Sequence, residues 1–186
     1  MAASRLIDAM NDAVGRVVAW LILADVLISS GNATVRYLFD KSSNAWLEAQ
    51  WYLFSAVFLL CAGYTLLRNE HIRIDIITGR LSPRVKAWID ILGGLFFLLP
   101  VALLIMVLSW PMFLDSFDRH EMSSNAGGLL LWPVKLLIPI GFLLLAVQAV
   151  SELIKRVAFL TGHAPPPTVR SAHAPLETIE AEEHVV

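Results

Sequence analysis

Four long apolar runs dominate this sequence and limit what it can fold into. They extend over residues 15–38, 45–67, 87–110 and 132–153. About 20 helical residues cross the hydrocarbon core of a bilayer, so each run is long enough to span a membrane. A mean hydropathy of +0.66 with 16% charged residues is also too apolar for an ordinary soluble domain of this length.

Helices account for these runs better than the strands of a barrel do. Apolar residues are continuous in each run, whereas barrel strands alternate between polar and apolar residues. Ser82-Pro83 and Trp132-Pro133 are typical helix starts, because proline in the first turn loses no hydrogen bond. Pro100 and Pro139 fall inside runs and are expected to kink them. The sequence therefore predicts an all-α integral membrane protein with four transmembrane helices.

The placement of Lys and Arg predicts the orientation. With four spans, the two terminal segments share one side with the link between spans two and three, and ten of the 14 basic residues lie there. They are Arg5, Arg16, Arg68, Arg73, Arg80, Arg84, Lys86, Lys155, Arg156 and Arg170. By the positive-inside rule this side is cytoplasmic. We therefore expect a multi-pass membrane protein with cytoplasmic N- and C-termini.

The segment RNEHIRID follows the second apolar run and is rich in charge. It places Arg68, Asn69, Glu70, His71, Arg73 and Asp75 where the chain leaves the membrane. Its continuation has Ile72, Ile76, Ile77 and Leu81 at roughly helical spacing, which predicts a short interfacial amphipathic helix between helices 2 and 3. A solvated positive loop is the simpler interpretation, but it does not explain why acids are mixed with the bases. Paired charges that fix a turn or meet a partner would explain the mixture.

The two ends of the chain differ from its membrane domain. Residues 1–13 are interpreted as a cytoplasmic N-terminal lead, residues 14–156 as a four-helix membrane domain and residues 157–186 as a disordered cytoplasmic tail. The tail is rich in Pro and Glu and has few large apolar residues.

Catalytic chemistry finds little support in the sequence. The single cysteine, Cys61, excludes a CxxC pair and a thiolate set for an iron–sulfur cluster. None of the five histidines falls in a predicted span, so no pair can hold a haem within the four helices. Phosphate-binding and nucleophile-elbow motifs are absent, and a net charge of -2 does not suit nucleic-acid binding. We predict no enzyme activity, no cofactor, no metal site and no nucleic-acid partner.

Three acids of the predicted spans need an explanation. Asp25 lies within the first span, where an ionisable group is costly unless it is paired, hydrated or protonated. It either contacts a polar group on a neighbouring helix or subunit or couples transport to an ion. Glu48 is expected to stabilise the positive end of the second helix after an Asn44 cap. Asp90 is expected at the interface, with Lys86 one turn before it.

Several segments together resemble one family of membrane proteins. NEHIRID (69–75) after span two, GGLLLWP (127–133) and IPIG (138–141) look like the small permease subunit of tripartite ATP-independent periplasmic (TRAP) transporters, the DctQ family. The resemblance covers roughly residues 13–156, and NEHIRID is its most specific part. GGLLLWP departs from many relatives, which have a proline before the aromatic residue.

The resemblance implies a partner-dependent role in transport. Relatives pair with a large multi-spanning permease subunit, while a periplasmic solute-binding protein delivers an organic acid and a sodium or other ion gradient drives symport. The small subunit enlarges a static scaffold in the bacterial cytoplasmic (inner) membrane. It then needs a partner-facing surface, where Gly93, Gly94 and Gly141 would permit close helix approach. Residues 111–131 are a candidate contact for the delivery protein. The interface or structural residues predicted in this way are Asp25, Arg68, Asn69, Glu70, His71, Arg73, Asp75, Gly127, Gly128, Trp132, Pro133, Pro139 and Gly141.

Two other classes of protein remain open from the sequence. One is a membrane-anchor subunit of a respiratory enzyme, which needs haem or quinone ligands that the spans do not supply. The other is a self-contained small transporter or channel that uses Asp25. The substrate and the coupling ion cannot be read from this chain.

Overall fold

The computed structural model describes residues 2–41, 43–68 and 81–163. Its helices are α1 (Ala2–Phe39), α2 (Asn44–Arg68), α4 (Pro83–Gly93), the π-helical segment η1 (Gly94–Leu98), α5 (Leu99–Asp118) and α6 (Trp132–Leu160). Within these ranges, paired extended backbone is limited to one bridge between Met122 and Leu130. The predicted interfacial helix falls largely on residues 69–80, which lie outside the described residues.

Four helical rods are long and apolar enough to cross a membrane, which confirms the predicted fold class. They are Ala2–Phe39, Asn44–Arg68, Pro83–Asp118 and Trp132–Leu160. The third rod starts where the sequence predicts, because Ser82 caps it, with the Ser82 hydroxyl accepting from Val85 N at 3.5 Å. Pro133 lies in the first turn of α6, as predicted. The first rod begins at Ala2, well before the predicted start of the span at Gly15.

The third rod contains η1 directly before Pro100. The proline ring lacks an N–H and crowds the carbonyl one turn earlier. The backbone widens at this point, because Leu99 N donates to Gly94 O, five residues earlier, instead of to the carbonyl four residues earlier as in an α-helix. The expected distortion at Pro100 therefore takes the form of a π-helical segment.

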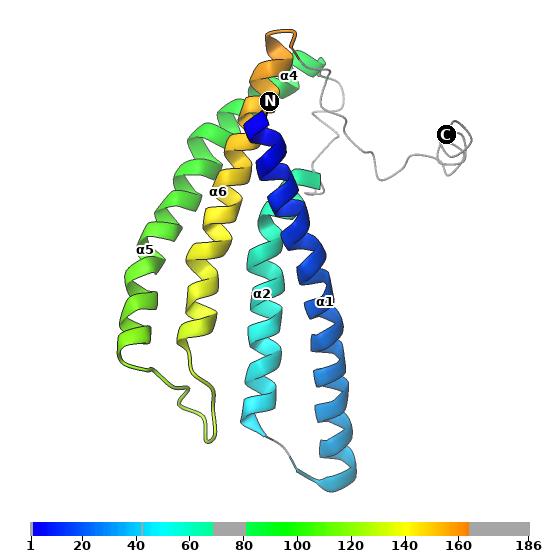
Figure 1. The fold of residues 1–186 in the computed structure, drawn as a ribbon, viewed down its shortest axis with the longest axis vertical. Helices are drawn as coiled ribbons and strands as arrows, with labels where there is room; N and C mark the ends of the chain where they lie inside the picture. Colours follow the sequence, from blue (N-terminus) through cyan, green and yellow to red (C-terminus); the bar gives the residue numbers. More distant parts are fainter. Residues whose placement is uncertain (1, 42, 69–80, 164–186) are drawn as a thin grey trace, which may run out of the picture.

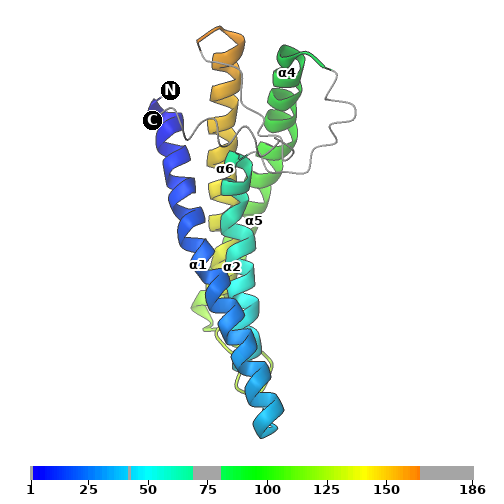
Figure 2. The ribbon, with the colours of Figure 1, turned by 90° about the vertical axis from the view of Figure 1, so that its right-hand side faces the viewer.

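The rods form two hairpins with α6 between the other helices (Figure 1). Helices α1 and α2 make one hairpin, and α5 and α6 make the other. Figures 1 and 2 place Ala2, α4 and the end of α6 at one end of the bundle, which we call the Ala2 end. The hairpin links, 40–43 and 119–131, lie at the opposite end, which we call the Phe39 end. In Figure 1 α2 and α6 diverge toward the Phe39 end, whereas Figure 2 shows α1, α6 and α4 spreading apart at the Ala2 end.

Glycines permit close contacts between the helices, both within a hairpin and between the two hairpins. A Cβ on Gly141 of α6 would lie 2.7 Å from the Leu59 carbonyl oxygen of α2, and one on Gly63 would lie 2.3 Å from Asn11 Oδ1. Gly94 faces the Leu153 side chain of α6, whereas a Cβ on Gly93 would meet nothing within 4 Å. The prediction placed Gly93, Gly94 and Gly141 on a partner-facing surface. Gly141 instead lies against α2 and Gly94 against α6 of the same chain, whereas a Cβ on Gly93 contacts no described residue.

Candidate functional site

A polar network at the Ala2 end joins α1 to α6. Gln148 Nε2 and Ser151 Oγ both donate to Asp8 Oδ1, at 2.9 and 2.8 Å. Lys155 Nζ lies 3.1 Å from Asp8 Oδ2. Asn11 Nδ2 donates to Gln148 Oε1 at 2.9 Å. Asn11, Gln148 and Ser151 are each 0% exposed, whereas Asp8 and Lys155 at the edge of the network are partly exposed, so its inner part excludes solvent although it is made of polar groups.

A second part of the network joins α6 to α4. Arg156 Nε lies 2.9 Å from Asp90 Oδ2, and Arg156 Nη1 also pairs with the Glu152 carboxylate one turn before it on α6. The Arg156 side chain is 7% exposed and the Glu152 side chain 15%. A buried arginine with two carboxylate partners holds both helices in fixed register. Asp90 thus has an ion-pair partner on a distant helix, which the sequence reasoning did not foresee.

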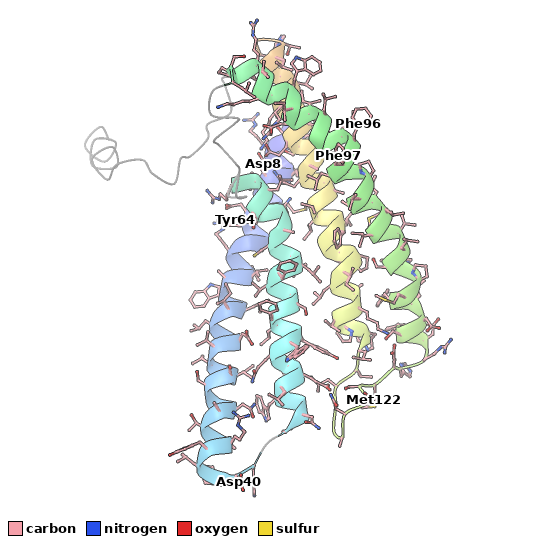
Figure 3. All side chains as sticks on the ribbon, turned by 180° about the vertical axis from the view of Figure 1, so that it is seen from behind. Asp8, Asp40, Tyr64, Phe96, Phe97 and Met122 are labelled. Atoms are coloured by element: carbon pink, nitrogen blue, oxygen red, sulfur yellow. The ribbon has the colours of Figure 1, made fainter. Side chains whose placement is uncertain are left out.

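Arg68 connects the end of α2 to α1. Its Nη2 lies 2.6 Å from Asp12 Oδ1, and its guanidinium lies over the Tyr64 ring, 5.1 Å from the centroid. Arg16 also pairs with Asp12, at 3.4 Å. Figure 3 shows Asp8 and Tyr64 at this end, on α1 and α2 respectively. Asn69, Glu70, His71, Arg73 and Asp75, which follow Arg68, lie outside the described residues.

At the Phe39 end, Glu48 of α2 fixes the 119–131 link. Its carboxylate accepts from Leu129 N at 2.6 Å, from Asn125 Nδ2 at 2.8 Å and from the Ser123 hydroxyl. Asn44 Nδ2 donates to Ala126 O at 3.1 Å, and Tyr52 OH donates to Leu130 O at 2.7 Å. We call this arrangement the Glu48 clasp. Sequence reasoning assigned Glu48 only to the helix dipole and missed the loop that it binds.

The predicted residues of the link shape the turn that Glu48 holds. Gly127 has φ +71°, a conformation that favours glycine, and a Cβ on Gly128 would lie 2.5 Å from Ser123 Cβ. Trp132 packs edge-on against Phe117, with ring centroids 5.4 Å apart. Pro133 begins α6, and Pro139 is fully buried within it. These residues, predicted from GGLLLWP and IPIG, shape one side of the clasp and the start of α6.

We expect the Glu48→Ala variant to release the link. Three donors would lose their acceptor, so the backbone amide of Leu129 should exchange with solvent about tenfold faster or more, because bonds to a charged acceptor are among the stronger ones. Hydrogen exchange followed by mass spectrometry at fixed pH measures this for residues 119–131. Asp115→Ala is the control, with exchange compared over residues 121–131, because among the described residues Asp115 forms an ion pair with Arg119 at 2.8 Å, just after α5, and both side chains are exposed. Equal exchange in wild type and Glu48→Ala contradicts the clasp.

An ion pair between Glu121 of the link and Lys135 of α6 predicts pH dependence. Lys135 donates to the Glu121 carboxylate, which holds the pKa of Glu121 below its ordinary value, although desolvation opposes this. Because the pKa is lower in the folded than in the unfolded protein, the pair stabilises the fold at neutral pH, and the benefit is lost as pH falls through the folded pKa. We expect wild type to have a higher melting temperature than Glu121→Gln at pH 7. The difference between the two melting temperatures should become smaller in strong acid. A difference independent of pH contradicts this assignment.

Asp25 differs from the other carboxylates described above. Its side chain lines a pocket of about 320 Å³ between α1 and α2, together with Gln50, Trp51, Phe54 and Ser55. Its Oδ1 is buried and has no hydrogen-bond partner within the described part of the chain. Sequence reasoning identified this residue, and the structure places it beside α2.

The described residues contain no group of three or more His, Cys, Asp or Glu side chains that could hold a metal ion. The fold and the polar networks define a helical membrane protein in which several charged groups, Asp8, Asp90 and Arg156 among them, join its own helices. A family model for the DctQ component of tripartite ATP-independent periplasmic transporters matches residues 25–159, and the chain belongs to this family. It is thus a small membrane subunit of a TRAP transporter, a transporter component rather than a member of an enzyme family. No curated protein and no solved structure gives a significant match.

Proposed function

We propose that this chain is the static scaffold subunit that holds a large multi-spanning TRAP permease subunit during uptake of an organic acid driven by an ion gradient, with sodium as the expected ion. A periplasmic solute-binding protein would deliver the acid to the pair of membrane subunits. The observation that carries the proposal is that polar contacts fix the helices at both ends of the bundle. The Asp8 and Arg156 contacts hold α1, α4 and α6 at one end, and the Glu48 clasp holds α2 to the link at the other.

Such contacts suit a scaffold better than a moving transport domain. Breaking a buried ion pair or a hydrogen-bonded carboxylate is costly, so the two hairpins should move together rather than slide past each other. A scaffold also needs a fixed orientation. The excess of Lys and Arg at the Ala2 end supports a cytoplasmic position for that end in the inner membrane. The 119–131 link would then face the periplasm, where the solute-binding protein docks.

Deletion of the gene tests the proposed role. We expect the deletion strain to lose sodium-dependent uptake of one compound in a panel of radiolabelled organic acids, and to regain it when the wild-type gene is supplied. The large subunit must still be present in the deletion membranes, which immunoblotting checks. Undiminished uptake of every acid that the parent strain takes up contradicts the proposal.

A further inference from the structure

The unpartnered carboxylate of Asp25 is the starting point for identifying the partner-facing surface. Asp25 lies in a rod that can cross a membrane, and no solvent reaches its Oδ1. A carboxylate in such a place is costly without a hydrogen-bond donor. The Asp8, Glu48, Asp90 and Glu152 carboxylates all have donors within the chain. A protein donor for Asp25 Oδ1 would therefore come from outside the described residues.

The pocket beside Asp25 leaves room for that donor. It has a volume of about 320 Å³ and lies at the side of the α1–α2 hairpin. Two aromatic rings border it, with Trp51 75% exposed and Phe54 65% exposed. Aromatic residues around a polar centre are typical of the buried core of protein interfaces. The pocket can accept one side chain from a neighbouring helix.

The outer surfaces of the two hairpins differ in chemistry. Exposed residues of η1 and the membrane part of α5 are uniformly apolar: Leu95, Phe96, Phe97, Pro100, Val101, Leu103, Leu104, Val107 and Leu108. Exposed residues of α1 beyond Asp25 include Ser29, Ser30 and Thr34. Lipid tails form no hydrogen bonds with hydroxyl groups, whereas a neighbouring helix can pack closely against small polar residues and form hydrogen bonds with them. The α5 surface suits lipid. On the α1–α2 hairpin, the polar residues of α1 beyond Asp25 suit a protein neighbour, whereas the exposed residues of α2, Trp51, Phe54 and Phe58 among them, are aromatic.

We propose that the large permease subunit docks on the α1–α2 hairpin, and that one of its membrane helices places a hydrogen-bond donor, most suitably Arg or Lys, against Asp25. The opposite charge of such a side chain matches the carboxylate, and the donated bond removes the cost of burying it. This inference rests on the proposed function and adds which surface meets the large subunit. The apolar face of η1 and α5 then faces lipid.

Photo-crosslinking tests the proposed surface with matched positions. A benzophenone amino acid replaces one exposed phenylalanine at a time in the membrane complex: Phe54 or Phe58 on α2, and Phe96 or Phe97 on η1. Their exposures are similar, at 65%, 71%, 64% and 73%, and Figure 3 labels Phe96 and Phe97 on the third rod. We expect crosslinks to the large subunit from Phe54 and Phe58 only. Crosslinks from Phe96 and Phe97 alone, or from Phe54 to a second copy of this chain, overturn the inference.

Substitution of Asp25 tests the proposed bond. We expect Asp25→Leu to reduce the large subunit recovered with the tagged chain by roughly tenfold, which corresponds to about 1.4 kcal/mol, because the variant removes an interhelical hydrogen bond within the membrane. Asp25→Asn, which keeps an acceptor oxygen, should lose less. Asp115→Asn is the control. Wild-type recovery with Asp25→Leu overturns the inference.

Two further measurements keep the outcomes apart. The melting temperature of each tagged variant alone in detergent shows whether it folds. If Asp25→Leu melts at the same temperature as wild type, its lower recovery of the large subunit results from a change at the interface. The wild-type chain is also purified without crosslinking. If it brings no large subunit with it, the proposed function fails. If it brings the subunit but the crosslinks lie on η1, only the choice of surface fails.

Discussion

The Arg156→Met variant should lose about 3–5 kcal/mol of unfolding free energy, the cost expected when one partner of a buried ion pair is removed. Arg156 pairs with Asp90 and Glu152, and its side chain is 7% exposed. Methionine keeps a long apolar stem but leaves both carboxylates without their shared cation. Unfolding by SDS titration in mixed micelles measures the change. Lower stability should come with looser packing of α4 on α6.

Arg119→Met is the control for that experiment. Arg119 pairs with Asp115 on the surface, and the two side chains are 75% and 56% exposed. Exposed pairs contribute little, so this variant should stay within about 0.5 kcal/mol of wild type. Equal losses in the two variants would show that Arg156 does not hold the helices together.

The Gly141→Ala variant should separate α2 from α6 at their closest contact. The added Cβ would lie 2.7 Å from the Leu59 carbonyl oxygen and 2.9 Å from the Leu59 carbonyl carbon. These are backbone atoms that cannot rotate away, so the helices must shift, at a cost of about 1–3 kcal/mol or more. The same SDS titration measures the loss, and a Trp emission shift should report the altered packing.

Gly93→Ala provides the matched control for Gly141. It adds the same methyl group to another helical glycine, where a Cβ would meet nothing within 4 Å. Because alanine favours helix over glycine by about 1 kcal/mol, this variant should be as stable as wild type or slightly more so. Stable Gly141→Ala protein would contradict the close α2–α6 contact.

The sequence predicted the helical rods well because their signals are local. Apolar length indicates a span, and Ser82-Pro83 indicates a helix start, with no knowledge of the rest of the fold. The pairing of the charged residues was not predictable in this way. Sequence reasoning looks for partners one turn away, whereas Asp90 pairs with Arg156, 66 residues later, and Gln148 bonds to Asp8 across 140 residues.

One sequence signal could have revealed part of the network. Gln148 lies in the apolar fourth run and Ser151 follows it by three residues, so both belong to one helix face. Polar groups in such a helix need partners, and this face continues to Lys155. The polar face of the fourth run thus predicts a polar contact with another helix. It does not predict that Asp8 is the partner, because the partner depends on how α1 is rotated about its axis. The roles of Arg73 and Asp75 in complex assembly remain predictions.

Purification of the tagged chain from its native membranes tests the central claim, that this protein works as part of a larger permease. We predict that, at native expression and in mild detergent, it elutes with a large multi-spanning TRAP permease subunit in a fixed ratio, identified by mass spectrometry. Elution of the chain alone, with uptake activity after its reconstitution into liposomes without any partner, would contradict this account.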